Sequence, residues 1–190
     1  MLIKAGILLR MTLTISLCCA LCYSPSSPVA AQASTPAASQ VLVDAAIKKA
    51  MDEHKTVLVE FGASWCVWCH HFDALLADSV AGPVMTAHYV VVHLVTQEKP
   101  ARKALENPGS GAMMAVLGGK SSGLPFLVAL DSTGKRIANS NLMPHGSNIG
   151  FPVSPAEVAA FDSFLVQTAP GISTEERAQI RAYLDRDAGR

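Results

Sequence analysis

Two cysteines three residues apart form the strongest chemical signal in the sequence. Cys66 and Cys69 follow a strand-like run of β-branched and apolar residues and precede a helix-like run. A helix N-terminus presents unpaired N–H groups and a positive dipole end, so a cysteine there favours the thiolate that attacks disulfides. Cys69 lies one turn deeper on the same helical face and can close a ring with Cys66. We therefore expect Cys66 to be the exposed nucleophile and Cys69 the resolving thiol.

A glutamate six residues before the first cysteine is the candidate acid–base residue. Glu60 stands in an otherwise apolar strand, where burial raises the pKa of a carboxyl group and costs stability unless the group is hydrogen-bonded. A role as proton acceptor for Cys69, directly or through water, would explain that position. The alternative is an outward-facing strand glutamate, and the pattern alone leaves both open.

Aromatic residues flank the first cysteine and two histidines follow the second. Trp65 and Trp68 predict an apolar docking rim for a substrate, although packing against the sheet is an alternative, more so for Trp65. His70 and His71 lie just inside the predicted helix. Most such histidines do no chemistry, yet a protonated imidazole near Cys66 would favour its thiolate.

The segment from Cys66 to His70 also satisfies the C-x-x-C-H pattern of covalent haem attachment. Met113, Met114 or Met143 would then supply a distal ligand. Copper or zinc held by the two thiolates and the histidine is the related alternative. A buried strand running into the cysteines is not required by a cytochrome, so we expect no cofactor and no metal, and keep a haem- or metal-binding module as the alternative.

The first 31 residues are predicted to be a secretory signal peptide. Lys4 and Arg10 precede an apolar stretch over residues 11–22, and small residues follow up to Ala31 and Ala33. The apolar stretch is shorter than the ~20 residues that a membrane-spanning helix needs. Cleavage after either alanine removes three of the five cysteines and leaves the C-x-x-C pair. We therefore expect a periplasmic or secreted protein.

Composition and charge narrow the function further. The 190 residues contain 15 basic and 15 acidic side chains, without a basic cluster that carries interleaved aromatics, so nucleic acid is not an expected partner. Residues 32–40, rich in Ala, Ser, Thr and Pro, predict a flexible leader, and residues 41–190 suit one domain. A disulfide across so few residues restrains little chain entropy, which favours a reactive pair over a structural one.

Hydrophobic periodicity predicts the elements that position these residues. Helices are expected over 42–51, ending near His54, and from the cysteine pair to Gly82-Pro83, with buried strands over 56–62 and 89–95. Short helices over 101–106 and 112–117 precede a hairpin of strands 126–130 and 135–139. Capping boxes at Ser154 and Ser173 begin two further helices.

This order of elements resembles the thioredoxin superfamily over residues 42–167. The resemblance rests on the strand, the Trp-Cys-x-x-Cys site, the helix that follows it, and Leu124-Pro125 before a later strand. Secreted thioredoxin-like proteins with this site are the most similar group. The resemblance implies an α/β, thioredoxin-like fold with a central mixed β-sheet flanked by helices, and residues 174–186 add an extra C-terminal helix.

The resemblance also implies an enzyme, a thiol–disulfide oxidoreductase. Glu60 occupies the position of a buried acid in thioredoxins, and Pro125 that of a cis-proline facing the cysteines. The Leu124 backbone would then hydrogen-bond an extended substrate in a groove, with Trp68 and the loop around Phe151 as the opposite wall.

The resemblance finally implies protein partners. These are protein thiols and disulfides, together with a membrane or periplasmic redox partner. The dipeptide Val67-Trp68 between the cysteines leaves the direction of exchange open. The surrounding Trp-Cys-x-x-Cys sequence after Phe61-x-Ala63 favours a reductase or interchange role.

Overall fold

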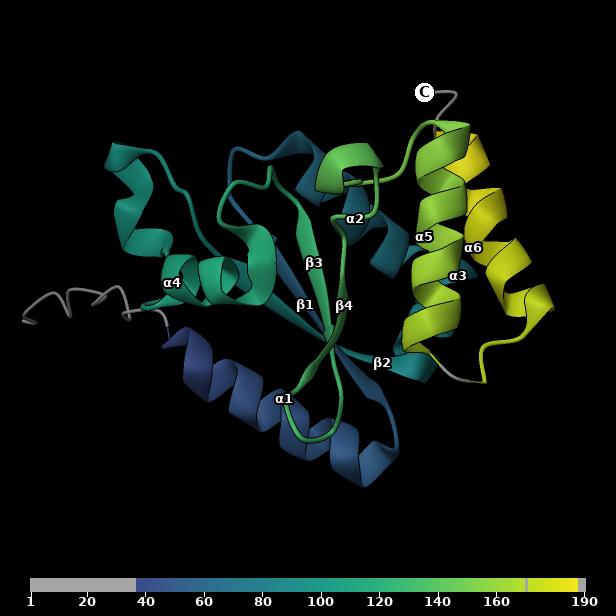
Figure 1. Cartoon of the computed structure of the whole chain (residues 1–190), viewed down its shortest axis with the longest axis horizontal. Helices are drawn as coiled ribbons and strands as arrows, with labels where there is room; N and C mark the ends of the chain where they lie inside the picture. The colour runs from purple at the N-terminus through teal and green to yellow at the C-terminus, as the bar shows by residue number, and fades with distance from the viewer. Residues whose placement is uncertain (1–36, 170, 188–190) are drawn as a thin grey trace, which may run out of the picture. The chain divides into compact units, whose positions relative to one another are not determined.

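A mixed four-stranded sheet forms the centre of the fold. The computed structural model describes residues 37–169 and 171–187. The strand order is β2-β1-β3-β4, with β1 parallel to β2, β1 antiparallel to β3, and β3 antiparallel to β4 (Figure 1). The strands are β1 (Thr56–Gly62), β2 (Tyr89–Val95), β3 (Phe126–Leu130) and β4 (Arg136–Asn139). The predicted mixed sheet and hairpin are confirmed.

Helices cover both faces of this sheet. They are α1 (Ser39–Glu53), α2 (Val67–Ala77), α3 (Ala81–His88), α4 (Ser110–Met114), α5 (Pro155–Thr168) and α6 (Thr174–Asp187). Two 3₁₀ helices, Pro100–Leu105 and Pro144–Gly146, and a π-helical turn, Ala115–Gly119, lie in the connections. Within the described ranges, no helix has the length and apolar character needed to cross a membrane.

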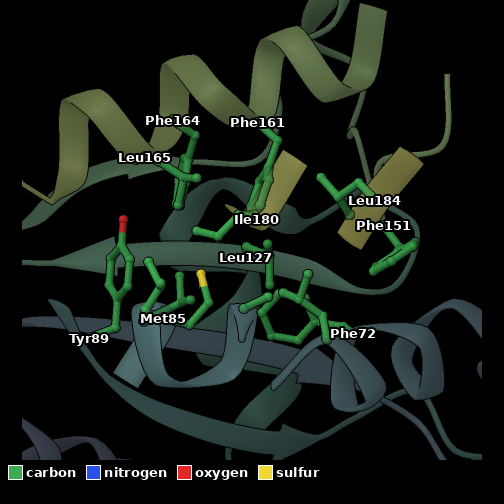
Figure 2. Close-up of a cluster of buried hydrophobic side chains, with 14 of the residues drawn as sticks. Phe72, Met85, Tyr89, Leu127, Phe151, Phe161, Phe164, Leu165, Ile180 and Leu184 are labelled. Atoms are coloured by element: carbon green, nitrogen blue, oxygen red, sulfur yellow. The ribbon is translucent and has the colours of Figure 1, made fainter. Parts of the chain in front are cut away.

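Alternation along the central strand β1 divides the core between the two faces. Val57, Val59 and Phe61 pack with residues of α1 and α4, whereas Leu58 packs with residues of α2, α3, α5 and α6. On the second face, Phe72 and Leu127 belong to the same buried cluster as side chains of α5 and α6 (Figure 2). This packing holds the start of α2 over the ends of β1 and β2, where the site lies.

The helix after the cysteines is shorter than predicted. α2 ends before Asp78, whose Oδ1 accepts hydrogen bonds from the N–H groups of Val80 and Ala81 at 2.9 and 2.8 Å and so supports the start of α3. Pro83 lies in the first turn of α3, where a missing N–H costs no intrahelical bond. The prediction of one helix reaching the Gly-Pro pair was wrong. The apolar periodicity continues from α2 into α3, and so does not reveal that the chain breaks at Asp78 and that the Asp78 carboxylate begins a new helix.

Both predicted capping boxes are confirmed. Ser154 and Glu157 satisfy each other's backbone N–H groups at the start of α5, and Ser173 and Glu176 do so at α6. α6 buries Ile180, Tyr183 and Leu184 against the core, which confirms the extra C-terminal helix.

The N-terminal helix begins inside the segment expected to be a leader. Ser39 is buried, and both its N–H and its hydroxyl donate hydrogen bonds to the carbonyl of Pro108, at 3.0 and 2.8 Å. These bonds to a distant loop hold the start of α1 at residue 39, two residues before the expected start of the domain at residue 41. The predicted signal peptide and residues 32–36 lie outside the described residues.

Candidate active site

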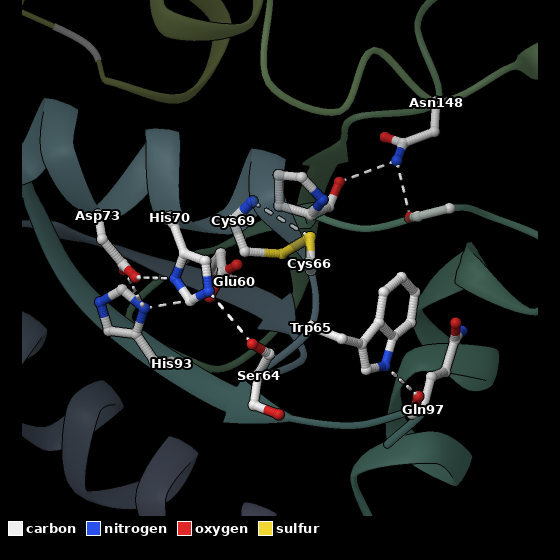
Figure 3. Close-up of a disulfide and its surroundings, with 12 residues drawn as sticks. Glu60, Ser64, Trp65, Cys66, Cys69, His70, Asp73, His93, Gln97 and Asn148 are labelled. Atoms are coloured by element: carbon white, nitrogen blue, oxygen red, sulfur yellow. Dashed lines mark hydrogen bonds and ion pairs between the residues drawn. A yellow bond between two sulfur atoms is a disulfide. The ribbon is translucent and has the colours of Figure 1, made fainter. Parts of the chain in front are cut away.

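Cys66 and Cys69 form a disulfide at the start of α2, with their α-carbons 5.3 Å apart (Figure 3). Cys66 is the N-cap residue, and its sulfur accepts a hydrogen bond of 3.1 Å from the Cys69 N–H. In the reduced protein the same N–H and the helix dipole favour a thiolate at Cys66.

Both cysteines are buried in this oxidised state. Cys66 is 4% exposed and Cys69 is 5% exposed, because they form a small cluster with Ala63 against which Leu124 packs. The expectation of an exposed Cys66 above a buried Cys69 is therefore wrong for the disulfide. The two cysteines differ in their surroundings, since Cys66 caps α2 and Cys69 lies beside Glu60.

Glu60 is buried on the α2 face of the sheet, at 3% exposure, so the outward-facing alternative is wrong. Its Oε1 lies 2.7 Å from the position that a Gly62 Cβ would occupy, and the Cys69 sulfur lies 3.2 Å from that same point. The missing side chain of Gly62 thus leaves a small space that the carboxylate and the sulfur share. Oε1 is buried and has no hydrogen-bond partner among the described residues.

The other oxygen of this carboxylate is held by a histidine on the neighbouring strand. His93 stands opposite Glu60 in the β1–β2 register and its Nδ1 lies 3.0 Å from Oε2. Burial raises the pKa of Glu60, while this hydrogen bond and the imidazole charge oppose that rise. The same hydrogen bond raises the pKa of His93. The two side chains therefore form a coupled acid–base pair.

A cavity of about 340 Å³ opens beside this pair. Cys69 lines it together with Glu60, His70, Asp73 and His93, and these four side chains lie on the Cys69 side of the disulfide (Figure 3). The side chain of His93 is 46% exposed, whereas that of Glu60 is 4% exposed. The cavity therefore connects a buried carboxylate with solvent through a half-exposed imidazole.

The segment before Cys66 is fixed by the loop that follows β2. The buried carboxylate of Glu98 accepts hydrogen bonds from the Ser64 N–H and hydroxyl, at 2.6 and 3.0 Å. Trp65 donates its indole N–H to the Gln97 carbonyl at 2.9 Å, and its ring is 43% exposed. The loop thus holds the entry to the C-x-x-C segment on the Cys66 side.

The two histidines of the helix contact oxygen atoms outside the cysteine pair. His70 Nε2 lies 3.2 Å from the Ser64 carbonyl oxygen, and its side chain is exposed. His71 Nδ1 lies 2.7 Å from a carboxylate oxygen of Asp187 at the end of α6. Within residues 37–169 and 171–187, no three His, Cys, Asp or Glu side chains are arranged as a metal site.

The face on the other side of the disulfide carries the residues that were expected to form a peptide groove. The Leu124–Pro125 peptide bond is cis, as the resemblance implied. Trp68 is 46% exposed and stacks on Phe151 with ring centroids 6.3 Å apart, so this tryptophan and the loop around Phe151 are in contact as expected. Leu124 also lines a cavity of about 590 Å³ that extends away from the cysteines.

Asn148 holds the Leu124 segment in place. Its side-chain amide donates hydrogen bonds to the carbonyls of Gly123 and Pro125, both at 2.9 Å, as the two dashed lines from Asn148 in Figure 3 show. Its Oδ1 accepts a hydrogen bond from the Ser140 hydroxyl. Leu124 lies between Gly123 and Pro125, and its own backbone N–H and carbonyl have no hydrogen-bond partner in the described part of the chain.

Three of these polar residues, His93, Glu98 and Asn148, were not predicted from the sequence. His93 interrupts an apolar strand, and strand alternation places it on the face of Glu60 once the register is known. Glu98 follows the end of β2, which lies beside the end of parallel β1, so its position near the site had a weak signal. Asn148 had none, because it stands in a polar loop with no periodicity.

The chain is similar to a protein family and to several solved structures. A family model described as "Thioredox_DsbH: Protein of unknown function, DUF255" matches residues 20–181. A disulphide isomerase from Xylella fastidiosa Temecula1 is 21% identical, with a TM-score of 0.45 over 61% of this chain and 80% of that chain. A DsbH oxidoreductase is 23% identical, with a TM-score of 0.39 over 75% and 92%. The oxidised C-terminal domain of Neisseria meningitidis DsbD is 22% identical, with a TM-score of 0.38 over 55% and 84%. A comparison with curated proteins gave no match.

Proposed function

This chain belongs to the Thioredox_DsbH family, and we propose that it is an exported enzyme that reduces or rearranges disulfides in other proteins. It is a thioredoxin-like thiol–disulfide oxidoreductase with a C-x-x-C pair. One observation carries the proposal most directly: Cys66 caps α2, and the Cys69 sulfur shares the space at Gly62 with the unpaired, buried oxygen of Glu60. Export is supported by the basic, apolar and small-residue order of the first 31 residues.

The proposed reaction begins with the reduced pair. The Cys66 thiolate attacks one sulfur of a substrate disulfide, forms a mixed disulfide with it, and releases the other substrate sulfur as a thiolate. Glu60 then accepts the Cys69 proton through the space above Gly62. The Cys69 thiolate attacks the Cys66 sulfur, which closes the disulfide and releases the second substrate sulfur. The substrate gains two electrons and the enzyme loses two.

The substrate is proposed to lie extended between Leu124 and Trp68. The free N–H and carbonyl of Leu124 can pair with a substrate backbone as in strand addition. Trp65 and Trp68 provide exposed apolar surface on the opposite sides of Cys66. Backbone pairing gives affinity with little dependence on side chains, which suits an enzyme that acts on several proteins.

Asn148→Asp tests this groove. The aspartate has the same shape but no N–H to donate to the two carbonyls, so the Leu124 segment loses two hydrogen bonds of about 1 kcal/mol each. We expect KM for a disulfide-bonded peptide to rise about tenfold, while alkylation of reduced Cys66 by a small reagent stays within about twofold, since the thiol itself is unchanged.

Asn141→Asp is the charge-matched control, because Asn141 lines the same cavity but binds the Gly118 carbonyl instead. An equal rise of KM in both variants would show that the added charge, and not the position of Leu124, weakens binding.

The equilibrium with glutathione tests the direction of exchange. A reductase or interchange enzyme is expected to have a reduction potential between those of thioredoxin and protein disulfide isomerase, about −270 to −180 mV. The measurement is the fraction of Cys66–Cys69 disulfide, read by mass after alkylation in a series of glutathione buffers. A potential near −120 mV would instead indicate a disulfide-forming oxidant. In the reducing direction, a redox partner must return two electrons after each cycle.

A further inference from the structure

We propose that His93 is a positioning residue for Glu60, which keeps the buried carboxylate ionised, directs its free oxygen at Cys69 and links it to solvent. This inference rests on the proposed function, because it concerns the step in which Cys69 loses its proton. Three observations carry it: the shared carboxylate, the charges around the imidazole, and the cavity.

The first observation is that the two carboxylate oxygens of Glu60 have different surroundings. His93 Nδ1 lies 3.0 Å from Oε2, and Oε1 is left without a partner beside the Cys69 sulfur. A carboxylate buried at this depth is costly unless a charge or hydrogen bond compensates for it. The imidazole provides both, and by occupying one oxygen it fixes the direction of the other.

The second observation is the set of charged groups that face the imidazole. Glu60 of β1 is the nearest, Asp73 of α2 lies 3.6 Å from the same Nδ1, and His70 of α2 and Glu98 of the following loop line the same cavity. The two carboxylates near Nδ1 favour the imidazolium, which explains the raised pKa of His93. The groups facing His93 thus hold a positive charge next to the proton acceptor.

The third observation is the path out of the site. His93 is half exposed and lines the cavity of about 340 Å³ together with Cys69 and Glu60. When Glu60 takes the Cys69 proton, it loses the negative charge that stabilises the imidazolium. The positive imidazolium disfavours the neutral carboxyl group beside it, so the proton leaves Glu60 for the water of the cavity. One proton reaches solvent for each Cys66–Cys69 bond that forms, and the Glu60–His93 ion pair is restored.

His93→Gln tests the proposal through the pH profile of the resolving step. An aromatic disulfide with coloured thiolates releases one thiolate when Cys66 attacks and the second when Cys69 resolves, so the two steps are read separately. Glutamine keeps an N–H donor but has no charge, so it should let the pKa of Glu60 rise further. The acid limb of the second release therefore moves to higher pH. We expect the second release to be about tenfold slower than wild type at mildly acidic pH and equal to it at alkaline pH.

His88→Gln is the matched control, because His88 forms a part-buried pair with Glu176, with 3.1 Å between Nε2 and Oε1, on the α3–α6 surface. It should leave both releases within about twofold of wild type. An unchanged pH profile in His93→Gln, or the same shift in His88→Gln, overturns the proposal.

A second measurement does not depend on activity. In NMR titrations, Glu60→Gln should move the His93 titration to lower pH, since the carboxylate is the first cause of its raised pKa; an unmoved titration would also overturn the proposal. If Glu60→Gln slows the second release and His93→Gln leaves its profile unchanged, only the role of His93 fails. If neither affects the second release, the role proposed for Glu60 fails as well.

Discussion

Cys66→Ser is expected to abolish disulfide exchange, whereas Cys69→Ser is expected to stop the reaction halfway. Cys66 caps α2, where an N–H and the helix dipole favour its thiolate, and a serine hydroxyl cannot replace this nucleophile. The loss should be on the order of 10³-fold or more, as for other covalent nucleophiles. Cys69→Ser keeps the first attack but has no thiol to break the mixed disulfide.

The coloured aromatic disulfide separates these outcomes. Wild type should release two thiolates for each protein molecule, Cys69→Ser one, and Cys66→Ser none. Mass spectrometry should find the reagent attached to Cys66 in the Cys69→Ser variant. A reagent adduct at Cys69 in Cys66→Ser, formed at the wild-type rate, would reverse the roles of the two cysteines.

Glu60→Gln is expected to slow the resolving step about 100-fold and to change the first attack by no more than about twofold. Only the second step needs a proton acceptor beside Cys69, and the glutamine amide is a much weaker one. Burial raises the pKa of Glu60, and below that pKa the carboxyl group is protonated and cannot accept the Cys69 proton. The wild-type resolving rate should therefore fall as pH falls through this range, and Glu60→Gln should lack that limb.

Thermal unfolding provides the control for Glu60→Gln. Because the pKa of Glu60 is raised in the folded protein, the folded state binds more protons than the unfolded state between the ordinary and the raised pKa, so wild-type stability falls as pH rises through that range. Glutamine removes this cost, and we expect Tm at neutral pH to be equal or higher. A slow variant with a lower Tm would point to misfolding, and a normal resolving rate would remove Glu60 from the mechanism.

Local interactions explain which features could be predicted from the sequence. The bounds of β1 and β2 followed from two runs of apolar, largely β-branched residues, which few other environments accept. The starts of α5 and α6 followed from serine–glutamate pairs three residues apart, whose reciprocal hydrogen bonds form within one turn. The cysteine pair at the start of α2 is equally local, because strand, pair and helix are consecutive in the chain. For the same reason, the main part of the resemblance to thioredoxins, the strand, the cysteine pair and the helix, could be read from contiguous residues.

Contacts between distant segments could not be predicted in this way, because they depend on how the elements pack. Glu60 and His93 are 33 residues apart, and a register change of one residue between β1 and β2 would put them on opposite faces of the sheet. Ser39 and Pro108 are 69 residues apart, and Asn148 reaches back 23 residues to Pro125. Hydrophobic periodicity shows which face of a single element is buried, but it carries no information about which polar group of another element meets that face. Strand pairing and loop packing determine those contacts. They bring the carboxylate of Glu60, the imidazole of His93 and the sulfur of Cys69 together.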